Sequence, residues 1–196
     1  VMGCASIIFA IEGYVYLESP DTNTPLVISH RGVSNKNGVQ NTVQSLEKTA
    51  QLKPDLIEMD VQETKDGQFV MMHDANLKNL TGINATPQDL TLDELTNTDI
   101  YENGYQTKIS SFDAYLERAN ALNQKLLIEI KTSKKDSPQM MDHFLEKYGA
   151  TIKKYGHQMQ SLDYHVIDKV LTYDSEIPVY FIRPYNSIFP RTKATG

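Results

Sequence analysis

The sequence predicts an α/β protein in which parallel strands alternate with helices. Six apolar runs with strand character are separated mostly by segments of helical periodicity, and such alternation indicates a right-handed parallel arrangement. Four runs end in ionisable residues rather than turn residues, which indicates one site at one rim of a parallel sheet or barrel. Six strands would complete a doubly wound sheet or three quarters of a (β/α)8 barrel. No GxGxxG or P-loop motif follows a strand, which argues against a nucleotide-binding sheet.

The first half of the folded region is predicted to run strand, helix, strand, turn, strand. Asn41 or Thr42 can cap the helix, whose apolar face carries Val43, Leu46 and Ala50. The expected elements are a strand over 26–30, a Gly/Asn-rich loop over 32–39, the helix up to residue 50, a strand over 56–62, a turn over 65–68 and a strand over 69–73.

The second half begins with a long polar stretch, residues 75–110, in which only a short helix is expected. Thr91 and Glu94 have the spacing of a capping box at the start of that helix. Such a long stretch often belongs to a functional loop or an insertion. The expected elements that follow are a helix over 112–122, a strand over 125–131, a helix over 138–152, a short strand over 160–163, a helix over 166–171 and a sixth strand over 177–182.

Apolar residues dominate the start of the chain, over residues 1–10, in a run too short to span a bilayer. The run is compatible with the last turns of a transmembrane helix, with a buried or disordered segment, or with a truncated lipoprotein cleavage box over residues 1–4. No Lys or Arg precedes Arg31, which favours the outer side of a membrane. We therefore expect an apolar or membrane tail (1–13), a linker (14–25) and one domain (26–196) that is attached to the cell membrane on its extracytoplasmic side.

The composition excludes some classes of partner and site. The net charge of −6 argues against a nucleic-acid groove, so no nucleic-acid partner is expected. Cys4 is the one cysteine, so the chain can form no internal disulfide and no cysteine-based metal site. The composition does not indicate an oligomeric state.

Three carboxylates are placed where a metal ion could bind. Glu58 and Asp60 lie two residues apart on one expected strand, so both side chains point to the same face. Glu129 and Lys131 repeat this spacing on another strand. Because the flanking residues are apolar, carboxylates brought together there would repel one another and need a counter-cation. Their oxygens suit a hard divalent cation, magnesium or calcium.

Two histidines at strand ends are the candidates for acid–base catalysis. His30 and His73 are each followed by a charged residue, and a histidine can give or take a proton near neutral pH. Arg31 offers a planar fork to a phosphate, and Lys131 offers a point charge. The remaining histidines lie in helical or loop contexts and are interpreted as surface or packing residues: His143, His157 and His165.

Taken together, these motifs resemble those of the glycerophosphodiester phosphodiesterase family. The chain is most similar to the membrane-anchored branch found in Gram-positive bacteria, which fits the apolar N-terminal run. Order and spacing of the motifs agree from about residue 26 to residue 182. The matching pieces are His30-Arg31-Gly32, Gln40-Asn41-Thr42, the segment 57–67, His73-Asp74, Glu129-Ile130-Lys131 and Ser161-Leu162-Asp163.

The resemblance implies a TIM (β/α)8 barrel that hydrolyses a small-molecule glycerophosphodiester to an alcohol and glycerol 3-phosphate. It places Glu58, Asp60 and Glu129 at the divalent metal. It gives His30 and His73 the roles of general base and general acid, and it places Arg31 and Lys131 at the substrate phosphate.

The chain departs from the family pattern in two respects. Many members have Glu where this chain has Gln40, and the family's barrel has eight strands where about six are expected here. A truncated, non-catalytic fragment of such an enzyme is therefore one alternative. A phospholipase-D-like phosphodiesterase that forms a cyclic phosphate is another, although those enzymes usually rely on disulfides and this chain has one cysteine.

Overall fold

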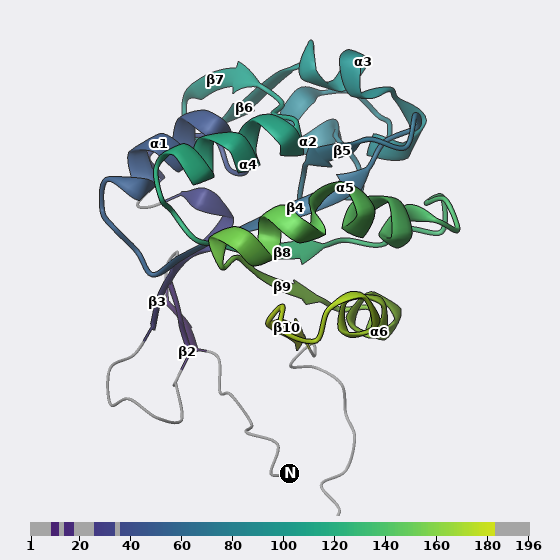
Figure 1. Ribbon diagram of the computed structural model, residues 1–196. Helices are drawn as coiled ribbons and strands as arrows, with labels where there is room; N and C mark the ends of the chain where they lie inside the picture. Colours follow the sequence, from purple (N-terminus) through teal and green to yellow (C-terminus); the bar gives the residue numbers. More distant parts are fainter. Residues whose placement is uncertain (1–8, 12–13, 18–25, 34–35, 183–196) are drawn as a thin grey trace, which may run out of the picture.

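The computed structural model describes residues 9–11, 14–17, 26–33 and 36–182. At the centre of the main sheet five strands run parallel, in the order β3, β4, β8, β9, β10 (Figure 1). Their bounds are β3 (Leu26–Ser29), β4 (Leu56–Glu63), β8 (Leu126–Ile130), β9 (Gln158–Ser161) and β10 (Val179–Phe181). The sheet is curled, as in part of a (β/α)8 barrel.

Four longer helices connect these strands: α1 (Val43–Ala50), α4 (Phe112–Ala121), α5 (Met140–Tyr155) and α6 (Tyr164–Tyr173). Helices α1, α4 and α5 lie together along one face of the sheet (Figure 1). Three of the helices begin at a side chain that accepts a hydrogen bond from the first turn, namely Thr42, Ser111 and Asp163. Of the two caps considered for the first helix, the structure therefore selects Thr42.

The third predicted strand differs from the expectation in its direction. Strand β5 (Phe69–Met71) pairs antiparallel with the end of β4, so the described part of the chain supplies five parallel strands rather than six. The physical reason is the short connection, because a turn closed by the Thr64 N–H and the Gln68 carbonyl (2.8 Å) cannot make the crossover that a parallel pair requires. Strand β3 pairs with the start of β4, and β5 pairs with the end of β4. The two strands therefore lie along the same edge of β4, and the segments that follow them begin close together.

The long polar stretch contains more structure than the sequence indicated. The expected capping box is present, with Thr91 accepting from the N–H of Glu94 at the start of α3. The segment holds α2 (Lys78–Thr81), a 3-10 turn (Pro87–Asp89), α3 (Leu92–Thr96), and the hairpin of β6 (Asp99–Glu102) and β7 (Tyr105–Lys108). Its apolar side chains form a separate core cluster with Val39 and the end of β5.

Every residue of β4 and β8 is buried, and alternate residues face opposite ways. Ile57, Met59 and Ile128 pack in the main core cluster with residues of α4 and α5. Residues on the opposite face of the same strands include Glu58 and Glu129. The alternation therefore separates an apolar face that binds the helices from a face that carries the carboxylates.

The N-terminal expectations fall partly outside the described residues. Strands β1 (Phe9–Ile11) and β2 (Tyr14–Leu17) form a hairpin, and β2 pairs antiparallel with β3. Residues 9–11 of the predicted apolar tail and 14–17 of the predicted linker are thus strands, since β2 pairs along the edge of β3 and β1 pairs with β2. Residues 1–8, 12–13 and 18–25, and the end of the chain from 183 to 196, lie outside the described residues. Within the described ranges, no helix is both long and apolar enough to cross a bilayer.

Candidate metal and phosphate site

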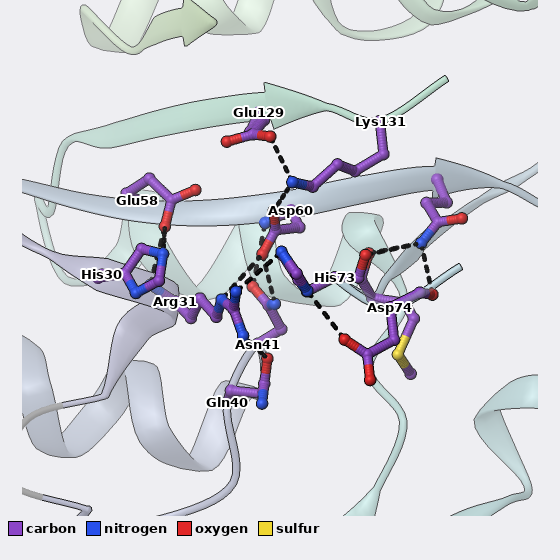
Figure 2. Close-up of polar contacts among 12 residues, drawn as sticks. His30, Arg31, Gln40, Asn41, Glu58, Asp60, His73, Asp74, Glu129 and Lys131 are labelled. Carbon is purple, nitrogen blue, oxygen red and sulfur yellow. Dashed lines mark hydrogen bonds and ion pairs between the residues drawn. The ribbon is translucent and has the colours of Figure 1, made fainter. Parts of the chain in front are cut away.

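Three carboxylates converge on one face of β4 and β8, near the end of β8. Asp60 and Glu129 are paired neighbours in the parallel register of the two strands, and Glu58 lies two residues earlier on the same face. One oxygen from each group lies within 4.8 Å of the other two, and all three residues are buried (Figure 2). The structure thus brings together the three residues that the sequence assigned to the metal.

Burial and mutual repulsion make this group of acids fit a cation. Burial first, and then the charges of Asp60 and Glu129, raise the pKa of Glu58 well above its usual range. A cation held among the three would offset both effects, and carboxylate oxygens are the ligands that magnesium and calcium prefer. The donor set therefore fits a hard divalent cation.

Lys131 reaches into the same group of acids. Its Nζ lies 3.1 Å from Asp60 Oδ1 and also contacts Glu129 Oε1 (Figure 2). Although partial burial acts to lower the pKa of Lys131, the two carboxylates raise it, so the side chain stays a cation at neutral pH. Glu129 is further held by Gln160, whose Nε2 donates to Oε2 at 3.0 Å. Lys131 thus supplies positive charge beside the three carboxylates.

Asn41 orients Asp60 through two hydrogen bonds. Its Nδ2 donates to Asp60 Oδ2 (2.9 Å), and its Oδ1 accepts from the Asp60 backbone N–H (3.0 Å). Asn41 adopts a positive φ of 55°, a conformation that asparagine tolerates better than most residues. The sequence indicates only a possible helix cap at this residue, because its pairing with Asp60 is a tertiary contact that spacing cannot show.

His30 follows β3 in a tight 3-10 turn (His30–Gly32). Arg31 and Gly32 have positive φ values of 54° and 65°, and a Cβ on Gly32 would lie 2.6 Å from the buried Tyr115 hydroxyl, so glycine is required there. The turn aims the Arg31 backbone N–H at Glu58 Oε2 (2.9 Å), and it leaves His30 Nε2 3.9 Å from the same oxygen. Burial and the charge of Arg31 lower the pKa of His30, so its imidazole is neutral at pH 7.

His73 lies just beyond β5 and is held by two neighbours. Its Nδ1 lies 2.9 Å from Asp74 Oδ1, and its Nε2 lies 2.8 Å from Arg31 Nη2. Because a guanidinium only donates hydrogen bonds, Nε2 accepts from Arg31 and Nδ1 carries the proton that is donated to Asp74. The buried Gln62 fixes this turn, since its Nε2 donates to the carbonyls of Met72 and Asp74, both at 2.9 Å.

Arg31 occupies the centre of the group (Figure 2). In addition to His73, its guanidinium donates from Nη1 to Gln40 Oε1 at 3.0 Å, and its Nε lies 4.0 Å from Asp60 Oδ2. The structure therefore brings all seven predicted site residues to one rim: His30, Arg31, Glu58, Asp60, His73, Glu129 and Lys131. Sequence reasoning gave no site role to Asn41, Gln62, Asp74 or Glu102, which act through contacts between elements distant in the chain.

The other three histidines are surface or packing residues, as predicted. His143 and His165 are exposed on helices α5 and α6. His157 is buried, where its Nδ1 accepts from the Leu126 N–H (3.1 Å) and its Nε2 lies 2.8 Å from Asn120 Oδ1. Its role is therefore to join the start of β8 to α4.

Comparison with known proteins gives a consistent set of relatives. The model of the glycerophosphoryl diester phosphodiesterase family matches residues 30–181. The human protein named lysophospholipase D GDPD1 is 27% identical over 169 residues, which are 79% of this chain and 50% of that protein. The chain thus spans about half the length of this curated relative. A glycerophosphodiester phosphodiesterase of Bacillus altitudinis is 27% identical over 194 residues, covering 87% of this chain and 77% of that protein.

Solved structures agree at the level of the fold. A phosphodiesterase from Oleispira antarctica, solved in complex with the product sn-glycerol-3-phosphate, superposes with a TM-score of 0.68 at 22% identity. The match covers 82% of this chain and 67% of the other. The family's structures are TIM barrels, and the curled parallel sheet described above is part of such a barrel, so the predicted fold class is confirmed.

Proposed function

Because the chain belongs to the glycerophosphoryl diester phosphodiesterase family, we propose that it hydrolyses glycerophosphodiesters to an alcohol and glycerol 3-phosphate. The observation that carries the proposal is the convergence of three buried carboxylates at the rim that also holds two histidines. Such a rim joins a place for a cation to two groups that can move protons, and metal-assisted phosphodiester hydrolysis uses both.

We propose that Glu58, Asp60 and Glu129 bind one divalent cation, magnesium or calcium. When bound, such an ion supplies a Lewis acid that polarises a phosphate oxygen and the attacking hydroxyl or water. The proposal is supported by the raised pKa of Glu58, because a carboxylate that resists ionisation on its own is stabilised by a nearby cation.

His30 is proposed as the general base. Its pKa is lowered by burial and by Arg31, so the ring is free to accept a proton at neutral pH. Its position, 3.9 Å from a Glu58 oxygen, places it beside the proposed metal and so beside a nucleophile activated there. The proton that it takes comes from water, or from the glycerol hydroxyl. If the glycerol hydroxyl attacks, the alcohol leaves and a cyclic phosphate forms, which water must then open to give glycerol 3-phosphate.

His73 is proposed as the general acid that protonates the leaving alkoxide. The hydrogen bond from Nδ1 to Asp74 fixes the ring, so that Nε2 faces the centre of the site. A proton on Nε2 would then face the Arg31 Nη2 donor at 2.8 Å, and two donors repel. Protonation of His73 therefore favours movement of Arg31 toward the substrate phosphate, where Arg31 and Lys131 stabilise the growing negative charge.

Attachment to the extracytoplasmic side of a cell membrane is a separate proposal. It is supported by the apolar run over residues 1–10 and by the absence of Lys or Arg before Arg31. Fractionation of cells that express the full protein tests it, with protection from added protease as the readout of sidedness.

The proposed activity is tested with glycerophosphocholine as substrate and an enzymatic assay for released glycerol 3-phosphate. Turnover is expected with magnesium or calcium and is expected to stop when a chelator is added. Replacing Glu58 or Glu129 by Gln should abolish turnover, while Glu146→Gln, a change on the exposed side of α5, should leave it unchanged. Equal rates in the chelated and metal-loaded protein would contradict the proposal.

A further inference from the structure

The hairpin β6–β7 is joined to the phosphate-binding arginine by a line of hydrogen bonds. Glu102, the last residue of β6, accepts one hydrogen bond from the Gln40 backbone N–H (2.7 Å) and one from Gln40 Nε2 (2.6 Å). Gln40 Oε1 in turn accepts from Arg31 Nη1 at 3.0 Å. A chain of hydrogen bonds therefore connects Glu102 in the hairpin, through the side-chain amide of Gln40, to the guanidinium of Arg31 at the centre of the site.

The chemistry of the three groups permits only one orientation of the Gln40 amide. A carboxylate accepts hydrogen bonds and a guanidinium donates them, so Nε2 must face Glu102 and Oε1 must face Arg31. Gln40 is only 8% exposed, so water offers little compensation for a reversed amide. Glu102 thereby determines which atom Gln40 presents to Arg31.

The guanidinium that is held in this way still has N–H donors that these hydrogen bonds do not use. Nη1 is bonded to Gln40 and Nη2 to His73, while Nε is buried without a hydrogen-bond partner among the described residues. A buried, unsatisfied N–H is costly, and a phosphate oxygen is a strong acceptor for it. Two of the five N–H donors of Arg31 thus hold the guanidinium in place, and the others, including the Nε N–H, are left for an anion.

The hairpin is itself fixed against the loop that precedes Gln40. Asn103, in the hairpin turn, donates from Nδ2 to the Gly38 carbonyl at 3.1 Å. Lys48 lies over the ring of Tyr105 at 4.3 Å and donates to the Asn37 carbonyl at 2.9 Å. The position of Glu102 relative to Gln40 is therefore supported by contacts on both sides of the hairpin turn.

We propose that Glu102 is a positioning residue, which orients Arg31 through Gln40 so that the inserted hairpin contributes to phosphate recognition. This inference rests on the proposed function of the site. In Glu102→Gln, the new amide meets two donors of Gln40, the backbone N–H and Nε2, so its own NH2 group must face one of them. If the Gln40 amide reverses to relieve this clash, its NH2 group turns toward Arg31, which is also a donor. We expect kcat/KM for glycerophosphocholine to fall by about 10-fold or more, mainly through a higher KM.

Two further variants separate positioning from a general effect on folding. In Gln40→Glu combined with Glu102→Gln, the carboxylate at position 40 can accept from both the amide at position 102 and the guanidinium of Arg31, so kcat/KM should return close to that of the wild type. In an Arg31→Ala background, Glu102→Gln should have no additional effect on kcat/KM. Asp99→Asn is the matched control, because it breaks a hairpin ion pair with Lys108 (2.8 Å) and touches neither Gln40 nor Arg31.

A spectroscopic readout keeps the inference separate from the proposed activity. The 15N NMR signals of the His73 ring report whether Nε2 accepts from Arg31, and they should change in Glu102→Gln but not in Asp99→Asn. If the wild type shows no turnover, the proposed function fails and these signals alone decide the inference. Unchanged His73 signals, an unchanged kcat/KM in Glu102→Gln, or an equal loss in the Arg31→Ala background would overturn it.

Discussion

Two buried or half-buried histidines show how the surroundings of a residue set its chemistry. Burial lowers the pKa of both His30 and His157. The side chain of His30 is nevertheless 45% exposed at the rim, whereas His157 is 1% exposed and uses both ring nitrogens in hydrogen bonds. Only His30 can therefore exchange a proton with a substrate, and His157 has a structural role.

The roles proposed for His30 and His73 predict large losses of activity. Replacing either residue by Ala should lower kcat by about 10²–10⁴-fold, the usual contribution of a positioned acid or base. Steady-state kinetics with glycerophosphocholine measure the effect, and His143→Ala, an exposed change on α5, is the control. Rates close to that of the wild type in either variant would show that the residue does not act as an acid or a base.

His157 predicts a specific dependence of stability on pH. Burial, and secondarily the charge of Lys125, lower the pKa of His157 from 6.5 to about 4. Between these values the unfolded chain binds a proton that the folded protein does not, so the free energy of unfolding falls as the pH drops from 6.5 toward 4, by roughly 3 kcal/mol from this residue.

Urea unfolding at several pH values between these limits measures this dependence. His157→Gln keeps an acceptor and a donor but does not titrate, so its stability should change less with pH than that of the wild type. His165→Gln, on the exposed side of α6, should retain the wild-type dependence. An equal pH dependence in His157→Gln would contradict the assignment.

At the level of elements, the positions of His30 and His73 depend on where strands β3 and β5 stop pairing with β4. Both meet β4 on the same edge, one at each end of the strand, and the two histidines follow these strands. Gln62 secures the second of them, because its Nε2 holds the turn that contains His73.

Gln62→Met should disturb this turn, since it keeps the length of the side chain but removes the donor. The buried Met72 carbonyl and the partly buried Asp74 carbonyl would each lose a partner, so we expect the free energy of unfolding to fall by about 1–3 kcal/mol and kcat to fall as well. Denaturant unfolding and steady-state kinetics measure the two effects, with the exposed Gln51→Met as the control. A destabilised variant with full kcat would mean that the turn does not position His73.

Local patterns explain which elements the sequence could predict. The spacing of Glu58 and Asp60, the same spacing of Glu129 and Lys131, and the apolar runs around them are sufficient to predict that the three carboxylates share one site. The antiparallel direction of β5 was missed, although the short turn before it was recognised. The hairpin at 99–108 was also missed, although Asn103-Gly104 is a strong signal for a two-residue hairpin turn, and both residues have positive φ.

The contacts of Gln40, Asn41 and Gln62 could not be predicted, because they join segments far apart in the chain. Gln40 lies 62 residues from Glu102, and Asn41 lies 19 residues from Asp60. Their polar side chains give no periodic pattern, and their partners are decided only when the sheet and the insertion pack together.

For the whole molecule, metal binding and stability should be linked. Because burial raises the pKa of Glu58, the metal-free protein keeps this carboxyl protonated at low pH and loses stability as the pH rises from the ordinary pKa through the raised one. A bound cation removes this cost and itself stabilises the folded state, by about 2.7 kcal/mol at a concentration of 100 times Kd.

Thermal unfolding with magnesium or calcium, and with a chelator, measures this linkage at pH 6 and pH 8. The rise in Tm on adding metal should be larger at pH 8, because protons compete with the cation at pH 6. Glu129→Gln should show a much smaller rise at both values. A metal-induced rise in Tm that is greater at pH 6 would contradict the proposed ligand set.

The most direct test of the central claim is 31P NMR of glycerophosphocholine incubated with the protein and magnesium or calcium. We expect the diester signal to be replaced by the monoester signal of glycerol 3-phosphate, and we expect His30→Ala, His73→Ala and a chelator each to prevent this conversion. A stable cyclic phosphate as the final product would instead indicate a cyclising phosphodiesterase. A diester signal that persists unchanged in the metal-loaded wild type would contradict the proposed activity.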